Sequence, residues 1–330
     1  MNGTLRAAAL AAGLGLVASP VAAQSVDMDD RSGWPDSFTV GTASQGGTYF
    51  TYGSGWANLV AEQLGISGGG QVTGGPVQNM ALVHAGDVEM GMTTLGPAFE
   101  AVNGRSPLAP GNPHENVRAM FPMYETPFVV TVLASSGVER IADIENGARI
   151  GFGPAGSTSD TYFPAMLETV GVEFNKRNGS WSDLAGQLQD GLLDVIAFAA
   201  GIPTPAVSQL EAQNEIRVLS FTEEEINAII EEFPVAEFTI PQRTYQSLDA
   251  DKQAVSMWNF AIASAELPAS FVYNVMEIVL GNNERMVEIH RAARATKPEF
   301  FDRNSFLPFH EGAWKWYEDN GFEVPDDLKG

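Results

Sequence analysis

Three short glycine-bearing segments hold the residue types best suited to binding a small anion. They are Gln45-Gly46-Gly47-Thr48-Tyr49, the turn at Gly75 with the following Val77-Gln78-Asn79, and Gly156-Ser157-Thr158. Glycine lets a backbone approach a ligand closely, and a loop that opens a helix presents free N–H groups at the positive end of the helix dipole. With the neighbouring hydroxyl and amide groups, these segments could hold a carboxylate without an arginine.

Two further positions belong to the same predicted ligand site. Thr94 follows the predicted strand 88–92, and the turn Gly201-Ile202-Pro203-Thr204-Pro205 follows a strand that we expect to end near Ala200. Each segment taken alone is also typical of an ordinary helix start or turn. The three glycine segments stand at matching places in the chain, and this arrangement favours the ligand site.

The sequence offers little for catalysis, metals or cofactors. The four histidines are His84, His114, His290 and His310, and none has a partner at the spacing of a metal-binding motif. No Gly-Lys pair occurs, which excludes the usual phosphate-binding loop of nucleotide hydrolases. We therefore predict no catalytic residue, no metal site and no cofactor, and keep an enzyme on the same fold as a less favoured alternative.

The elements that must position these residues occur in the same order twice. A strand, a glycine loop, a helix, a strand, a helix and a strand follow one another near residues 38–93 and again near 148–199. Strands that alternate with helices are typical of an α/β fold with a mostly parallel sheet. The loops after parallel strands lie at one edge of the sheet, so the glycine segments of both halves are expected to face one crevice.

Two apolar runs, Phe128–Leu133 and Met257–Ile262, predict strands that cross between two lobes. Such strands would form a hinge beside a ligand cleft. The remaining predictions are a flexible arm over 24–37, lobe I over 38–127 and 263–330, lobe II over 128–262, a short strand near 71–73, and helices over 270–280, 283–295 and 311–319.

Charge and the first residues indicate where the protein works. The 330 residues include 18 lysines and arginines against 41 aspartates and glutamates, for a net charge of -23. Such a surface repels nucleic acid and anionic lipid. Residues 1–23 combine Arg6, an apolar stretch and Val21-Ala22-Ala23, which predicts a cleaved signal peptide. The absence of cysteine excludes a disulfide and a lipid anchor on an N-terminal cysteine, so we expect an unanchored protein in the periplasm.

Several motifs, in order and at the right spacing, resemble those of the TAXI-type solute receptors of tripartite ATP-independent periplasmic (TRAP) transporters. The matching segments are Val40–Tyr49, Thr73–Asn79, Gly86–Gly91, Gly153–Thr158, Asp190–Asp194, Phe198–Pro203 and Leu307–Gly312. The resemblance implies a periplasmic-binding-protein fold of a type II-like plan, with two crossing hinge strands and a ligand cleft between the lobes. Pro76 departs from the pattern, because similar receptors often have serine there and proline lacks an N–H donor.

The resemblance also implies a function. A receptor of this kind, expected as a monomer, would capture a small anionic or zwitterionic solute by hinge closure and deliver it to TRAP permease subunits in the membrane. Ligands of similar receptors are small organic acids or amino acids such as glutamate, 2-oxoglutarate and other dicarboxylates. A periplasmic receptor that reports its ligand to a membrane signalling protein is the main alternative.

Overall fold

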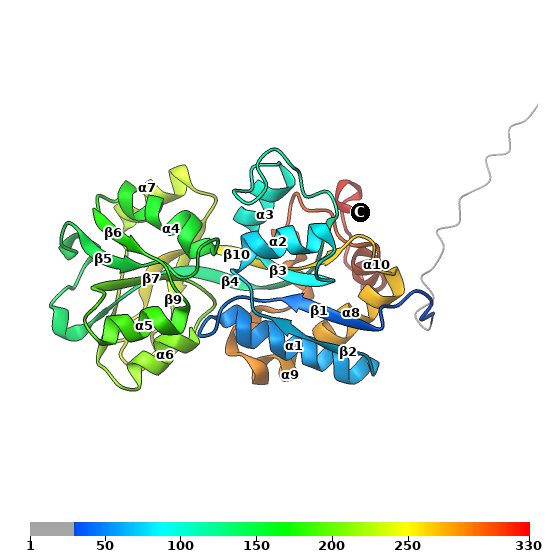
Figure 1. The fold of residues 1–330 in the computed structure, drawn as a ribbon, viewed down its shortest axis with the longest axis horizontal. Coiled ribbons are helices and arrows are strands. Elements are labelled where there is room, and N and C mark those ends of the chain that lie inside the picture. Colours follow the sequence, from blue (N-terminus) through cyan, green and yellow to red (C-terminus); the bar gives the residue numbers. More distant parts are fainter. Residues whose placement is uncertain (1–29) are drawn as a thin grey trace, which may run out of the picture.

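Residues 30–330, the part of the chain that this computed structural model describes, form two α/β lobes that lie side by side (Figure 1). The predicted signal peptide 1–23 and the first residues of the predicted arm lie outside the described residues. Within residues 30–330, no helix is both long enough and apolar enough to cross a membrane. The α/β fold class expected from the alternating pattern is confirmed.

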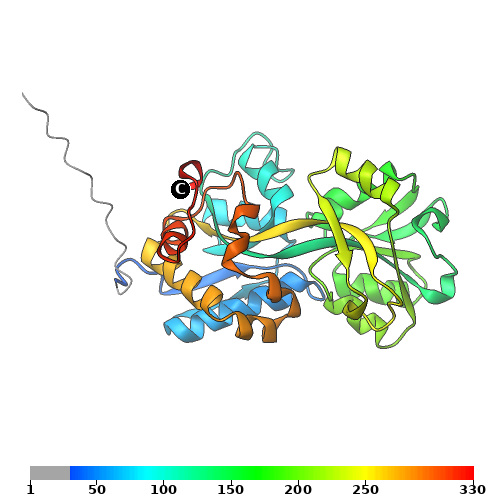
Figure 2. The same cartoon turned by 180° about the vertical axis from the view of Figure 1, so that it is seen from behind.

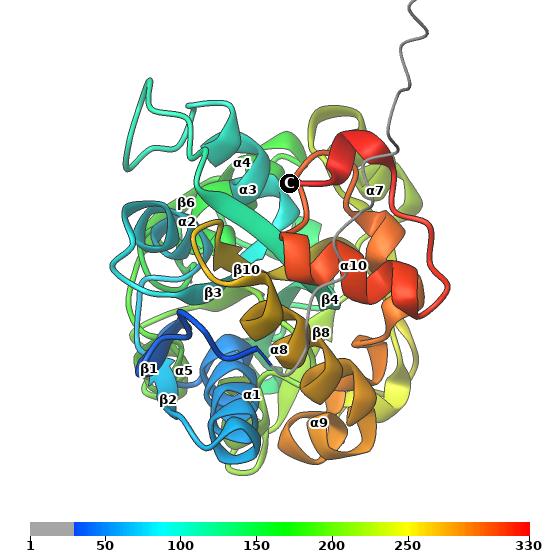
Figure 3. The same cartoon turned by 90° about the vertical axis from the view of Figure 1, so that its right-hand side faces the viewer.

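The first lobe is built around three parallel strands, in which β1 (Ser37–Gly41) lies between β2 (Ser67–Gln71) and β3 (Met90–Thr94). Helices from both ends of the chain pack around this sheet; they are α1 (Thr48–Leu64), α2 (Pro76–Ala85), α3 (Leu95–Val102), α8 (Ala269–Gly281), α9 (Asn283–Ile289) and α10 (Glu311–Asp319). α8 contacts both α1 and α10, so the C-terminal helices complete the lobe that the N-terminal strands begin (Figure 3).

The second lobe repeats this plan. β5 (Ala148–Gly151) lies between β6 (Phe174–Arg177) and β7 (Val195–Ala199), and all three strands are parallel. The other elements are α4 (Thr158–Thr169), α5 (Trp181–Gln189), α6 (Pro205–Glu211), β8 (Ile216–Leu219), α7 (Glu223–Glu232) and β9 (Ala236–Ile240). The doubled order of strands and glycine loops in the sequence corresponds to these two matching sheets.

Two long antiparallel strands connect the lobes, β4 (Val117–Leu133) and β10 (Lys252–Ser264), and they run side by side between them (Figure 2). Met120 and Phe260 belong to the core of the first lobe, whereas Val130 and Val255 belong to a core of the second. The predicted crossing runs at 128–133 and 257–262 are therefore confirmed as parts of longer strands. The residue bounds of the lobes stay a prediction.

Two predicted elements are wrong in their extent. The strand expected near 71–73 lies earlier, at β2, whose glycines resemble a loop in the sequence; a Cβ atom at Gly68 would lie 2.3 Å from the ring of Phe38. The helix expected over 283–295 ends at Ile289, because the His290 backbone is extended and a turn of 3-10 helix follows. The Nδ1 atom of His290 accepts a hydrogen bond from the backbone N–H of Ala292 at 3.1 Å and so begins that turn.

The described part of the predicted arm contacts the first lobe. The indole of Trp34 donates a hydrogen bond to Ser270 at 2.9 Å and meets the ring of Phe271 edge-on, with 5.4 Å between the ring centroids. Arg31 donates to the carbonyl of Leu64 at 3.0 Å. These contacts connect the chain before β1 to α1 and α8.

Two buried histidines make the fold sensitive to acid. Burial lowers the pKa of His290 and of His310 to about 4, because the charged imidazolium is poorly solvated there. The neutral rings therefore stabilise the folded protein at neutral pH, and this stabilisation is lost as the pH falls below about 6.5 towards 4. We expect the free energy of unfolding to fall by about 3 kcal/mol for each histidine over this interval, measured by urea denaturation at several pH values.

A single substitution separates this effect from general acid denaturation. The Nδ1 atom of His310 accepts from the backbone N–H of Gly312 at 3.1 Å at the start of α10. Asparagine is also a good acceptor at a helix start but does not titrate, so His310→Asn should remove the contribution of His310, about 3 kcal/mol between pH 6.5 and 4. An unchanged dependence in this variant would contradict the assignment to His310.

Candidate functional site

A small cavity lies between the two lobes at the carboxyl ends of their parallel strands. Both lobes and one crossing strand line it, with Ala43, Gly47, Thr48, Tyr49, Pro76, Thr94, Thr126, Ser157, Thr158, Trp181, Ala199 and Ala200. Its volume is about 20 Å³, which is room for about one water molecule. The structure is therefore a closed arrangement in which the two walls of the cleft contact each other.

Hydrogen bonds between the lobes hold the cleft closed. The hydroxyls of Thr94 and Thr158 lie 2.6 Å apart, and Thr48 donates its hydroxyl to the carbonyl of Gly201. Beside the cavity, the backbone N–H of Ala206 donates to the carbonyl of Gly46 at 3.0 Å. Nε2 of His290 lies 3.1 Å from the carbonyl of Pro203. Since Nδ1 of His290 already accepts a hydrogen bond, Nε2 is the donor in this contact.

The starts of five helices meet at this cavity. Its lining residues include the N-caps or first residues of α1, α2 and α3 from the first lobe and of α4 and α5 from the second. Each start carries the positive end of a helix dipole and backbone N–H groups that have no partner within the helix. None of the lining residues is an aspartate, glutamate, lysine, arginine or histidine. The cavity wall therefore favours an anionic group, although it carries no formal charge.

The helix starts of the two lobes differ in how they are capped. α1, α2 and α3 have no side-chain cap and no acidic residue in the first turn. By contrast, Ser157 caps α4 and Ser180 caps α5, and each helix has an aspartate in its first turn, Asp160 and Asp183. The positive ends of the helix dipoles are consequently less compensated on the first-lobe wall than on the second-lobe wall.

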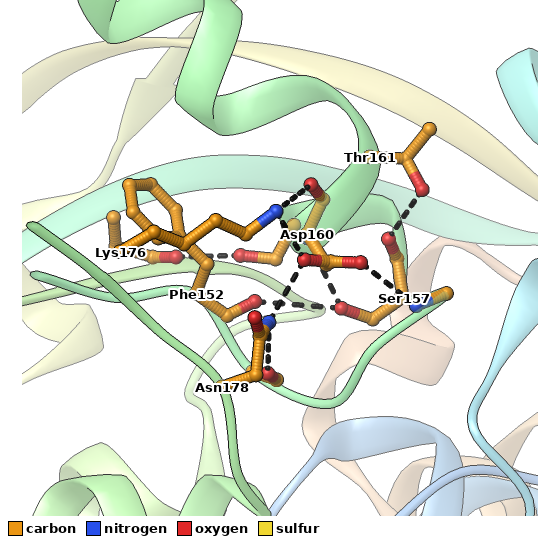
Figure 4. A network of polar contacts seen from close by, with 10 residues as sticks. Phe152, Ser157, Asp160, Thr161, Lys176 and Asn178 are labelled. Carbon is orange, nitrogen blue, oxygen red and sulfur yellow. Dashed lines mark hydrogen bonds and ion pairs between the residues drawn. The ribbon is translucent and has the colours of Figure 1, made fainter.

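Asp160 is the centre of a polar network behind the Ser157 turn (Figure 4). Its carboxylate accepts from the backbone N–H of Gly156 at 2.9 Å and from the side-chain amide of Asn178 at 2.8 Å. The ammonium of Lys176 lies 2.5 Å from the same carboxylate and also donates to the backbone carbonyl of Asp160. The segment Gly156-Ser157-Thr158 thus already binds an anion, which is the carboxylate of Asp160.

A buried asparagine on a crossing strand organises the floor of the site. Asn259 in β10 accepts from the hydroxyl of Tyr49 at 2.7 Å and from Thr126 at 3.0 Å. Its amide donates to the carbonyl of Tyr124 at 2.5 Å. Burial raises the pKa of Tyr49 well above its ordinary value, so this phenol stays neutral. One side chain therefore connects α1 to both strands of the hinge, and sequence reasoning did not find it.

Six of the residues predicted for ligand binding line the cavity, and nine do not. Those in the wall are Gly47, Thr48, Tyr49, Thr94, Ser157 and Thr158; those outside it are Gln45, Gly46, Gly75, Val77, Gln78, Asn79, Gly156, Gly201 and Ile202. Several of the second group use their polar atoms inside the protein. The amide of Asn79 donates to the carbonyls of Thr42 and Met92, and Gln78 accepts from the backbone N–H of Gly74.

The remaining lining residues are Ala43, Pro76, Thr126, Trp181, Ala199 and Ala200. Trp181 is the first residue of a helix that follows a separate strand, and nothing in its local sequence distinguishes it from a core tryptophan. A Cβ atom at Gly47 would lie 2.6 Å from the Trp181 indole, so this glycine permits contact between the lobes. Within residues 30–330, no group of three or more histidine, aspartate or glutamate side chains could hold a metal ion.

Comparison with known proteins agrees with this architecture. The chain is similar to PhnD1 from Prochlorococcus marinus, solved in complex with methylphosphonate, with a TM-score of 0.51 and 13% identity over 80% of this chain and 92% of that one. A substrate-binding protein of an ABC uptake transporter from Streptococcus pneumoniae has a TM-score of 0.47 and 18% identity, over 78% of this chain and 91% of that one. At 13% identity, the likeness to PhnD1 concerns the fold. Residues 40–321 match the model of the NMT1-like family, and this chain therefore belongs to the NMT1-like family.

Proposed function

We propose that this protein is a periplasmic receptor that captures a small organic acid or amino acid between its lobes and delivers it to a TRAP permease in the membrane. The observation that carries the proposal is the convergence of five helix starts on one cavity without charged side chains. Helix starts bind carboxylates through backbone N–H groups. A position between two lobes joined by two strands is a frequent place for a ligand site.

Capture would work by rotation of the lobes about β4 and β10. In the closed structure, the Thr94–Thr158 and Thr48–Gly201 hydrogen bonds occupy groups that would face a ligand in the open cleft. A ligand that binds between the lobes would take over part of these contacts and would stabilise closure by its greater affinity for the closed state.

The proposals of a TRAP permease as the partner and of the periplasm as the location are based on the sequence. The predicted signal peptide supports export, and the motif resemblance supports a TRAP permease as the partner, with glutamate and 2-oxoglutarate among the ligands to be tested first. A receptor that reports to a membrane signalling protein is the second candidate. Uptake of the ligand by membranes that contain the permease, only when the receptor is added, would distinguish transport from signalling.

The ligand class can be tested directly by thermal unfolding. We expect at least one small carboxylate or amino acid to stabilise the mature protein, because a ligand at 100 times its dissociation constant adds about 2.7 kcal/mol. The measurement is a thermal-shift screen across monocarboxylates, dicarboxylates and amino acids, followed by titration calorimetry of each hit. The absence of any stabilisation across these classes would contradict the proposed ligand class.

Two substitutions locate the binding of any hit. Thr48→Val and Ser157→Ala each remove a hydroxyl from the cavity wall, one in each lobe. We expect Thr48→Val to weaken binding by about tenfold, as loss of a hydrogen bond to a charged group does, and Ser157→Ala to weaken it by about threefold, as loss of a hydrogen bond to an uncharged group does. Ser136→Ala is the matched control, because its hydroxyl is exposed and donates to the carbonyl of Leu133. Unchanged affinity in both cavity variants would show that the ligand binds elsewhere.

A further inference from the structure

We infer that the ligand carries one negative charge and no positive charge: a small monocarboxylate whose carboxylate binds the first lobe and whose uncharged remainder lies against the second. The inference rests on the proposed function and narrows its ligand class. It depends on two observations. The helix starts of the first-lobe wall are uncapped whereas those of the second-lobe wall are capped, and Asp160 forms a hydrogen-bond and ion-pair network behind the second-lobe wall.

The first-lobe wall is where a carboxylate finds donors. α1, α2 and α3 begin there without a side-chain cap and without an acidic residue in the first turn, so nothing on these helices compensates the positive ends of their dipoles. Thr48 and Thr94 add hydroxyls at two of the three helix starts. Pro76 supplies no N–H at the first position of α2, but later N–H groups of that turn remain.

The second-lobe wall offers little to a second carboxylate. The hydroxyl of Ser157 accepts from the backbone N–H of Asp160 at 3.1 Å, and the N–H of Gly156 donates to the Asp160 carboxylate. Lys176, the cation beside this turn, is paired with the same carboxylate. The rest of the wall includes the indole of Trp181 and the methyl groups of Ala199 and Ala200. A second charge buried against this wall would lose its hydration and gain only the hydroxyl of Thr158 and the indole N–H of Trp181 as side-chain partners.

The same lining opposes a ligand ammonium. An α-ammonium buried in a closed site needs a carboxylate or several carbonyl acceptors to replace its water. No aspartate or glutamate lines the cavity, and the Thr126 hydroxyl already accepts from the side-chain amide of Asn259 at 2.7 Å. A 2-oxo or 2-hydroxy acid with a short apolar chain fits these walls better than an amino acid of the same length.

Matched ligands test the charge of the solute. The three acids 2-oxopentanoate, 2-oxoglutarate and norvaline have the same chain length and differ in the second carboxylate or in the ammonium. Titration calorimetry of the mature protein should show 2-oxopentanoate binding at least tenfold more tightly than either of the others. Tighter binding of 2-oxoglutarate or norvaline would overturn the inference while leaving the proposed receptor function intact. The absence of binding by any organic acid or amino acid would instead contradict the proposed function itself.

Substitutions of the network test the role of Asp160. Asp160→Asn keeps the shape of the side chain but leaves Lys176 without its anion, so the second lobe gains a positive charge beside the Ser157 turn. We expect the preference for 2-oxopentanoate over 2-oxoglutarate to fall by about tenfold, and the double variant Asp160→Asn, Lys176→Met to restore it. An unchanged preference in Asp160→Asn would overturn this role.

The control for net charge lies at the other edge of the same sheet. Asp194 forms a salt bridge of 2.5 Å with Arg149, and both residues stand at the amino ends of parallel strands rather than at the cleft. Asp194→Asn changes the net charge of the protein by the same amount as Asp160→Asn. It should leave the preference between the two acids unchanged, and an equal change in both variants would overturn the argument that the location of the charge matters.

Discussion

Replacement of Asn259 by leucine should cost the protein about 3–5 kcal/mol of its unfolding free energy, the range expected when a buried hydrogen-bond network loses its central member. Asn259 is fully buried and bonds to Tyr49, Thr126 and the carbonyl of Tyr124. Leucine has a similar branched shape but is larger, and it leaves these groups buried without partners. Urea denaturation at neutral pH measures the loss, and calorimetry should show that ligand affinity falls with it, because Tyr49 and Thr126 line the cavity.

Asn103→Leu is the matched control for this substitution. Asn103 is exposed at the end of α3, where its amide donates to the carbonyl of Phe99 at 2.8 Å. A change of less than about 1 kcal/mol is expected there, as for most exposed positions. If Asn259→Leu destabilised the protein no more than Asn103→Leu, the network would have no structural role. If it destabilised the fold but left ligand affinity unchanged, the ligand would not contact the residues that Asn259 holds.

Asn259 is also an example of a structural role that could not be predicted from the sequence. The order of strands and helices, the two crossing runs and the places of the glycine loops follow from local patterns, because periodicity and turn residues act over a few positions. Asn259 lies in an apolar run, and its partners Tyr49 and Thr126 stand far away in the chain. The pairing of β4 with β10 brings Thr126 to Asn259, and the packing of α1 in the first lobe brings Tyr49 to the same side chain.

The positions of the glycine segments were predictable from the sequence, but the hydrogen-bond partners of their polar atoms were not. Sequence alone indicates that Gly46, Gly75 and Gly156 let the backbone approach a ligand or a neighbouring segment closely. In the structure, the carbonyl of Gly46 accepts from Ala206 of the other lobe, and the N–H of Gly156 donates to Asp160. A polar atom near a ligand site can bond to the ligand or to the protein, and local sequence does not distinguish these cases. The wall residues that were missed, such as Trp181 and Ala200, come from segments without any such signal.

Gly47→Ala should hold the lobes apart and weaken ligand binding by about a hundredfold. A Cβ atom at this position would lie 2.6 Å from the Cδ1 and Nε1 atoms of Trp181, which belongs to the other lobe. The φ of Gly47 is -90°, so alanine introduces no backbone strain and the first lobe itself should fold normally. Because affinity depends on the fraction of molecules that can close, a penalty of about 2.7 kcal/mol on closure produces this loss. Calorimetry measures the affinity, and small-angle X-ray scattering should show a larger radius of gyration with saturating ligand.

Gly186→Ala separates steric obstruction from a general effect of the substitution. Gly186 lies inside α5, the helix that Trp181 begins, and a Cβ atom there would meet no other atom within 4 Å. Alanine should stabilise this helix by about 0.5–1 kcal/mol and leave affinity unchanged. Rescue provides the second check: Trp181→Ala in the Gly47→Ala background removes the obstructing indole and should recover closure in scattering. If Gly47→Ala bound ligand as tightly as the unmodified protein, the contact between Gly47 and Trp181 would not be part of the ligand-bound state, and the closed cleft described above would not be the form that holds the solute.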